Sequence, residues 1–244
     1  MPAIFAGLPH LQRFLFGAAC GAALGAASPS AACDLALLLA VDVSGSVDKN
    51  EYRIQMEGLA EGLRDPVVSE ALVRGQAALA LVQWTGTSRQ DLNIPWTTVT
   101  TPAELEALAE RISEQPRIWI EYSTAIGEAL TFAADVFDDA PACKRRVVDI
   151  SGDGRSNEGV EPLEVHGYLR SLAITVNALV IRGDDDSLPA YFADNVILGG
   201  NAFVMTAENY DEYPDRMRRK LRRETERPIS LLRSDRPVPA AYQD

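Results

Sequence analysis

The stretch LALLLAVDVSGS, residues 35–46, decides the fold. Its first seven residues form a continuous apolar run, which is typical of a β-strand covered on both faces. The turn that follows places a carboxylate at Asp42 and hydroxyls at Ser44 and Ser46. A buried strand that ends in a polar turn and leads into a helical pattern predicts the first unit of a sheet with helices on both faces.

Apolar runs and helical periods alternate through the rest of the chain. Further strands are predicted at 77–84, 92–99, 147–150, 174–181 and 202–205, and helices at 52–63, 102–112, 126–137, 162–172 and 208–224. The short link between 77–84 and 92–99 predicts an antiparallel edge pair, and Asp65-Pro66 is expected to end the first helix. We therefore predict an α/β fold, with a three-layer, doubly wound, mostly parallel six-stranded sheet, helices on both faces and one antiparallel edge strand.

Composition excludes several classes of protein. The chain has 244 residues, 47% of them hydrophobic, and a formal net charge of −12. This hydrophobic fraction argues against a disordered chain, and the acidic balance argues against a nucleic-acid-binding surface. His10 and His166 are the only histidines, which excludes a histidine-rich metal site. We expect His166 at the surface and Asp149, inside a predicted buried strand, in a structural role.

The two ends of the chain differ from its middle. Residues 1–32 carry one ionised side chain, Arg13, followed by an apolar run too short for a membrane span, which predicts a signal peptide. The alternatives are a buried N-terminal helix or a lipid anchor at Cys33. We predict a domain over 33–225 and a flexible tail over 226–244 that contains proline and arginine. Export would place the protein in the periplasm or outside the cell.

The three cysteines then become two. Cys20 leaves with the predicted signal peptide, and Cys33 and Cys143 remain. An oxidising compartment favours a disulfide between them. The alternative is a pair of free thiols.

Polar residues follow the predicted strands and precede one helix. Thr124 opens the helix at 126–137, and Asp153 follows the strand at 147–150 in the turn SGDG. Such sheets bind ligands beyond the carboxyl ends of their strands. Together with Asp42, Ser44 and Ser46 these residues form a set of oxygen donors suited to Mg²⁺, Mn²⁺ or Ca²⁺. The alternative is that Asp42, Ser46 and Thr124 only cap helices.

This constellation resembles the metal-ion-dependent adhesion site (MIDAS) of von Willebrand factor A domains. The resemblance covers about residues 34–224, and the stretches WTG, SGDG and TAIGEAL look like an uncharacterised group of secreted bacterial proteins within that superfamily. It implies Asp42, Ser44, Ser46 and Thr124 as direct or near-direct ligands, with Asp153 often acting through water. It also implies an acidic protein partner that completes the metal shell, and neighbouring first and fourth strands that bring Cys33 and Cys143 to the opposite edge of the sheet.

The leading hypothesis is therefore an exported, monomeric binding module, not an enzyme, with Glu121 and Tyr122 as candidate partner contacts. A metal-dependent hydrolase or phosphatase is an alternative, although a dehalogenase-like phosphatase needs a second acid where Ser44 stands. A structural envelope protein with an empty site is the other alternative. Nine basic residues against three acidic ones over 216–236 suggest weak contact with a membrane or an acidic partner, or else a solvated face.

Overall fold

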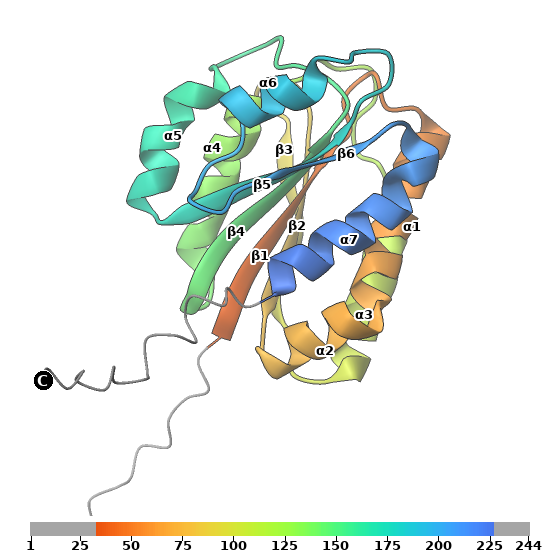
Figure 1. Ribbon diagram of the computed structural model, residues 1–244, viewed down its shortest axis with the longest axis vertical. Helices are drawn as coiled ribbons and strands as arrows, with labels where there is room; N and C mark the ends of the chain where they lie inside the picture. The colour runs from red at the N-terminus through yellow and green to blue at the C-terminus, as the bar shows by residue number, and fades with distance from the viewer. Residues whose placement is uncertain (1–32, 227–244) are drawn as a thin grey trace, which may run out of the picture. The chain divides into compact units, whose positions relative to one another are not determined.

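The computed structural model describes residues 33–226, and the predicted signal peptide and all but the first residue of the predicted tail lie outside these described residues. Six strands form one sheet in the order β3-β2-β1-β4-β5-β6 (Figure 1). Their bounds are β1 Cys33–Asp42, β2 Ala78–Trp84, β3 Gln90–Thr98, β4 Cys143–Gly152, β5 Ile174–Ile181 and β6 Val204–Ala207. Only the β2–β3 pair is antiparallel, which confirms the predicted fold class.

Helices cover both faces of this sheet. Their bounds are α1 Lys49–Arg64, α2 Pro66–Arg74, α3 Pro102–Ser113, α4 Ile126–Val136, α5 Pro162–Ser171, α6 Leu188–Asn195 and α7 Tyr213–Thr225, with short 3₁₀ turns η1 Phe137–Asp139 and η2 Tyr210–Glu212. Figure 1 shows α1, α2, α3 and α7 on one side and α4, α5 and α6 on the other. The fold is therefore three-layered.

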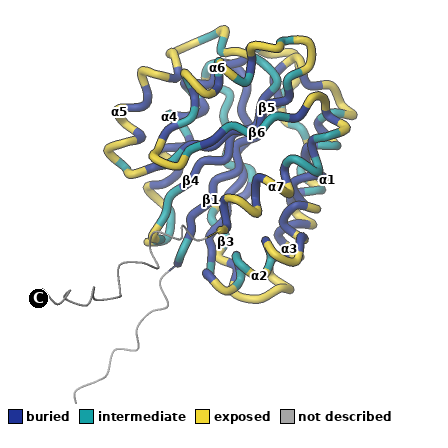
Figure 2. Tube along the Cα trace, viewed as in Figure 1, coloured by how far each residue is buried: buried dark blue, intermediate teal, exposed yellow. Residues whose placement is uncertain are grey.

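Strand β1 lies in the middle of two cores. Because side chains alternate across a strand, Leu37 and Leu39 join the core under α1, α3 and α7, while Leu38 and Ala40 join the core under α4, α5 and α6. All four are almost fully buried, and the tube in Figure 2 is dark along β1. The continuous apolar run in the sequence reflects this burial on both faces.

Local capping explains where the helices begin. Asp48 caps α1, with Glu51 reaching back to the Asp48 backbone N–H, and Thr101 and Glu104 form the same capping box on α3. Asp65-Pro66 ends α1 as predicted, but it also begins α2, because Asp65 caps that helix and Pro66 occupies its first turn. Helices α2 and α6 were not expected from the sequence.

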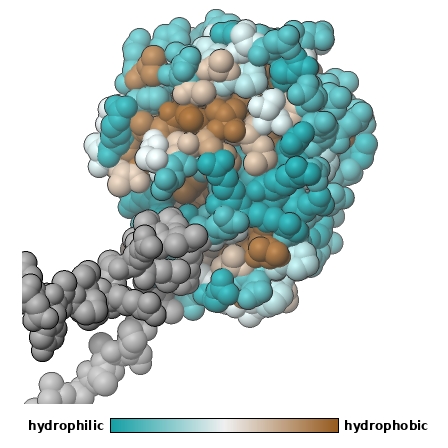
Figure 3. All heavy atoms as spheres, in the orientation of Figure 1, coloured by the Kyte–Doolittle hydropathy of each residue, from teal (hydrophilic) through white to brown (hydrophobic). Residues whose placement is uncertain are grey.

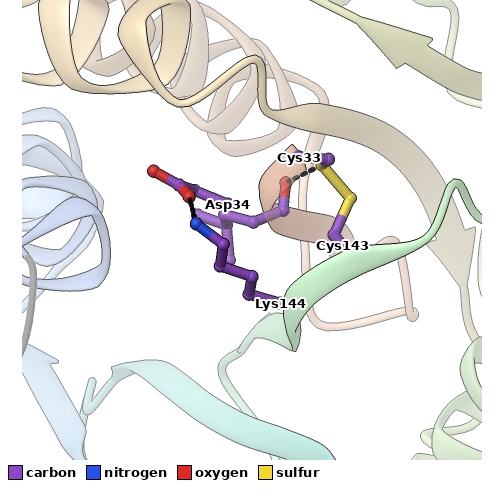
Figure 4. Close-up of a disulfide and its surroundings, with 5 residues drawn as sticks. Cys33, Asp34, Cys143 and Lys144 are labelled. Carbon is purple, nitrogen blue, oxygen red and sulfur yellow. Dashed lines mark hydrogen bonds and ion pairs between the residues drawn. A yellow bond between two sulfur atoms is a disulfide. The ribbon is translucent and has the colours of Figure 1, made fainter. Parts of the chain in front are cut away.

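A disulfide joins Cys33 at the start of β1 to Cys143 at the start of β4 (Figure 4). The two residues are register partners in the parallel β1–β4 pair, with Cα atoms 4.4 Å apart. Beside them, Lys144 forms a 2.7 Å ion pair with Asp34. Because both strands run parallel from this edge, the disulfide lies at the opposite edge from the residues that follow β1 and β4.

The prediction for His166 was wrong. The side chain is buried on α5, only 6% exposed, and its Nε2 lies 3.3 Å from the backbone oxygen of Val196. Asp149 was expected to have a structural role. It is buried in β4 and forms an ion pair with the buried Lys220 of α7, which is consistent with that role. No helix in residues 33–226 is long and apolar enough to cross a membrane.

Candidate metal centre

Asp42 is the most deeply buried acid of the predicted site. It is the last residue of β1 and has no exposed surface. Its Oδ1 accepts the backbone N–H of Ser44 at 2.7 Å, which fixes the carboxylate in the turn. Its Oδ2 is buried and receives no hydrogen bond from any described residue. Burying a carboxylate oxygen without a hydrogen-bond donor costs free energy. A positively charged neighbour would lower this cost.

Asp153 faces the same turn from the end of β4. Ser46 Oγ donates to Asp153 Oδ1 at 2.5 Å, and the hydroxyl oxygens of Ser44 and Ser46 lie 3.2 Å apart. Strands β1 and β4 are parallel neighbours, so their carboxyl ends meet at one edge of the sheet. The structure therefore brings Asp42, Ser44, Ser46 and Asp153 together at that edge.

Thr124 reaches this edge from the segment before α4. The side chain is buried, and its Oγ1 is turned toward Gly154, where a Cβ atom would lie 3.6 Å away. Two hydrogen bonds fasten Thr124 to the loop after β4, from the Thr124 N–H to Asn157 Oδ1 and from the Asn157 N–H to the Thr124 oxygen, each 2.9 Å long. All five residues of the predicted metal set, Asp42, Ser44, Ser46, Thr124 and Asp153, thus lie around the turns that follow β1 and β4. Together they form the candidate metal motif.

The electrostatics of the site are those of two converging carboxylates. Burial, and then the charge of Asp153, raise the pKa of Asp42 to about 7, although hydrogen bonds from Ser44 and from the Asp153 backbone act in the opposite direction. No group of three or more His, Cys, Asp or Glu side chains that could hold a metal gathers within residues 33–226. The predicted donor set is two carboxylates and three hydroxyls, which fits a hard divalent cation.

Three supporting residues were missed by the sequence analysis. Gln55 Nε2 donates to the Asp42 backbone oxygen at 3.2 Å, and Arg117 Nη2 donates to the oxygens of Val43 and Ser44. Tyr210, in η2 before α7, donates its hydroxyl to Asp153 Oδ2 at 2.9 Å. Tyr210 and Asp153 are 57 positions apart, so no local pattern could have linked them.

Glu121 and Tyr122 border the site through Gly45. The Gly45 N–H donates to the backbone oxygen of Tyr122 at 2.7 Å. A Cβ atom at Gly45 would lie 3.3 Å from Glu121 Cα, so the close approach of the two backbones favours glycine. Glu121 has a positive φ of 63°, and Arg89 lies 3.9 Å above the Tyr122 ring. Both residues stand at the rim of the metal motif, where the sequence analysis placed them as candidate contacts.

A groove of about 860 Å³ opens beside this rim. It lies between the start of α1 and the segment after α3, and its lining includes Gly45, Val47, Met56, Arg117 and Ile120. Ile120 is 64% exposed and Ile118 is 40% exposed, so apolar side chains stand next to the polar site. The groove therefore adjoins the turn after β1 through Gly45 and the rim through Glu121.

Solved structures with the same fold include von Willebrand factor A domains. Proximal thread matrix protein 1 from the mussel byssus matches with 20% identity over 78% of this chain and 47% of that chain, at a TM-score of 0.62. A second structure of that protein, with a zinc occupied MIDAS motif, matches with 19% identity over 78% and 48% of the two chains, at 0.63. The von Willebrand factor type A structure from Catenulispora acidiphila matches with 18% identity over 80% and 43%, at 0.58.

At these identities the likeness shows the fold alone, and this chain spans about half the length of those solved chains. The von Willebrand factor A-like fold is thereby confirmed. No curated protein matches the chain. The family described as "Protein of unknown function (DUF1194)" matches residues 32–229, which is most of the sequence. This chain therefore belongs to the DUF1194 family and has a von Willebrand factor A-like fold.

Proposed function

We propose that this protein is a binding module that holds a divalent cation at Asp42, Ser44, Ser46, Thr124 and Asp153 and captures an acidic segment of a protein partner. One observation carries the proposal: Asp42 Oδ2 is buried without a donor from the described residues, at the sheet edge where a second carboxylate and three hydroxyls converge. The cation we propose is Mg²⁺, with Mn²⁺ and Ca²⁺ as the other candidates.

The residues of the chain divide the work in this proposal. Asp42 and Asp153 balance a divalent charge, while the hydroxyls of Ser44, Ser46 and Thr124 serve as neutral ligands. A cation bound by these residues keeps a coordination position open to the outside. A carboxylate of the partner can occupy that position and complete the ligand shell. In support, one solved structure with this fold is described as having a zinc occupied MIDAS motif.

The partner would also contact the surface beside the metal motif. Tyr122 is 41% exposed, and with Ile118 and Ile120 it forms three alternating exposed side chains on the segment before α4. Apolar surface at the edge of a polar site is typical of protein interfaces. We therefore propose that Glu121 and Tyr122 contact the partner, and that residues next to its acidic side chain enter the groove.

The proposed location is the periplasm or the outside of the cell. The Cys33–Cys143 disulfide supports it, because disulfides persist in oxidising compartments. We propose a monomer without nucleic-acid contact. Contact of the basic C-terminal segment with membranes has little support in its described part, because Arg216, Arg218, Arg219 and Arg222 form ion pairs with acidic residues. Figure 3 shows the face around α7 as largely hydrophilic.

Isothermal titration of the full chain with Mg²⁺ and Mn²⁺ tests the proposed metal site. We expect saturable binding that Asp42→Ala abolishes. Asp138→Ala, an exposed acid of η1 outside the metal motif, serves as the control and should bind like the wild type. Absence of binding in the wild type, or equal binding in Asp42→Ala, would overturn the proposal.

We assign no catalytic residue. The one histidine in the described residues, His166, lies buried on α5 against Val196 and belongs to no nucleophile arrangement there. Generic phosphate and ester substrates should not be hydrolysed. A metal-dependent phosphatase activity that Asp42→Asn removes would contradict this assignment and favour the hydrolase alternative.

A further inference from the structure

The two carboxylates of the site differ in how the protein holds their oxygens. In Asp42 the backbone N–H of Ser44 holds Oδ1, and Oδ2 receives no hydrogen bond from the described residues. In Asp153 the Tyr210 hydroxyl donates to Oδ2 and the Ser46 hydroxyl donates to Oδ1. Because Ser46 is itself a predicted ligand and Tyr210 is not, Oδ1 is the Asp153 oxygen beside the other ligands, and Oδ2 is held by a residue outside the predicted ligand set.

Tyr210 is well placed to keep this arrangement. It lies in η2, between β6 and α7, and its side chain is buried in the core that contains α1 and α7. Its ring packs in that core while its hydroxyl reaches Asp153 across 2.9 Å. Because the ring is held by packing, the hydroxyl limits rotation of the Asp153 carboxylate.

Cations differ in what they require of a carboxylate. Mg²⁺ demands six ligands in a nearly regular octahedron at about 2.0–2.1 Å, whereas Ca²⁺ takes roughly six to eight ligands and readily uses both oxygens of one carboxylate. A carboxylate with one oxygen occupied by a hydrogen bond suits the first requirement and not the second.

We propose that Tyr210 determines the cation preference of this site, by holding Asp153 so that it offers one oxygen and thereby favouring Mg²⁺ over Ca²⁺. This inference rests on the proposed metal-binding function. It adds a positioning residue from the β6–α7 connection, which the three sequence motifs do not include.

Titration of the full chain with Mg²⁺ and, separately, with Ca²⁺ tests the proposal in wild type, Tyr210→Phe and Tyr213→Phe. Removing the hydroxyl frees Asp153 to rotate, so Tyr210→Phe should lower the ratio of Mg²⁺ to Ca²⁺ affinity. The expected change is about tenfold, because loss of a residue that orients a metal ligand costs at least about that factor in affinity and the proposal places this loss on Mg²⁺. Tyr213 is also buried, and its hydroxyl donates to no carboxylate of the site in the described part of the chain. Tyr213→Phe should therefore leave the ratio unchanged.

The outcomes separate this inference from the proposed function. If wild type binds neither ion, the metal site itself is wrong. If wild type binds Mg²⁺ and Tyr210→Phe weakens both ions by one common factor, or changes neither, Tyr210 has only a structural role and the inference fails.

Infrared spectroscopy of the wild type adds a test that does not depend on a folded variant. The separation of the two carboxylate stretching bands distinguishes one-oxygen from two-oxygen coordination. We expect only one-oxygen coordination with either ion, and a two-oxygen band with Ca²⁺ in the wild type would overturn the inference.

Discussion

Gly152 shows how closely the metal motif depends on single atoms. It is the last residue of β4, and a Cβ atom there would lie 3.1 Å from Asp42 Oδ2 and 3.5 Å from the Trp84 ring. Trp84 is fully buried, so it cannot move aside easily. Glycine at this position therefore leaves the Asp42 carboxylate its room beside the Trp84 ring.

We predict that Gly152→Ala weakens Mg²⁺ binding about tenfold, because the new methyl group displaces a ligand oxygen. Gly154→Ala is the matched control, since its Cβ would meet Thr124 Oγ1 at an ordinary 3.6 Å and should change the affinity little. Calorimetric titration of both variants measures the difference. Equal affinities in the two variants would show that Gly152 does not set the position of Asp42.

At the scale of elements, α7 is attached to the sheet through buried charges. Lys220 is fully buried and forms ion pairs with Asp149 of β4 and Glu224 of its own helix, the second at 2.7 Å. Asn177 of β5 donates to the same Glu224 oxygen at 2.9 Å. One cation cannot neutralise two acids, so a proton on one of them lowers the cost of burying the group.

The pKa of Glu224 reflects this imbalance. Burial, and then the charge of Asp149, raise it from 4.5 to about 8, against the opposing effect of Lys220. The folded protein therefore keeps a proton on Glu224 between about pH 4.5 and 8, a range in which the unfolded chain releases it. Stability from this group is present at the acidic end of that window and is lost as the pH rises through 8.

We predict that Glu224→Gln removes this part of the pH dependence, because its amide carries no proton to lose and its oxygen can still accept from Asn177. Urea unfolding of wild type and variant from pH 5 to 9 measures it. The stability of Glu224→Gln relative to the wild type should rise with pH and level off above pH 8. A difference that stays constant over this range would contradict the assignment.

At the scale of the whole molecule, the disulfide and the candidate metal centre occupy opposite ends of the same two strands. Cys33 pairs with Cys143 where β1 and β4 begin, and Val41 pairs with Ser151 close to where they end. The disulfide joins two cysteines that are 110 residues apart in the sequence, so it closes a long loop. The disulfide, which restricts the unfolded chain, is thus far along the strands from the residues of the candidate metal centre.

We predict that Cys33→Ser with Cys143→Ser lowers the free energy of unfolding by about 4–5 kcal/mol, the size expected for a loop of this length. Mg²⁺ affinity measured below the unfolding midpoint should stay as in the wild type. Chemical denaturation and calorimetry on the same samples provide the two measurements. A large loss of cation affinity in the folded double variant would show that the two edges are coupled.

Much of the architecture could be predicted from the sequence because its signals are local. Apolar runs identified the strands, and the short link between β2 and β3 identified the antiparallel edge. Pro66 shows the limit of such reasoning, because a proline that ends one helix can equally occupy the first turn of the next. Helix α6, eight residues long, was missed because two turns give too little periodicity.

The sequence by itself determined the fold class and the residue types of the candidate site. Apolar strand runs, glycine turns and neighbouring hydroxyl residues each lie within a short segment, so they can be recognised locally. Only the tertiary structure decided which distant side chains complete these features. Tyr210 meets Asp153 across 57 positions, Lys220 pairs with Asp149 between a helix and a strand, and His166 is buried against Val196. Such partners follow from how the layers pack, and packing brings together residues that no local spacing relates.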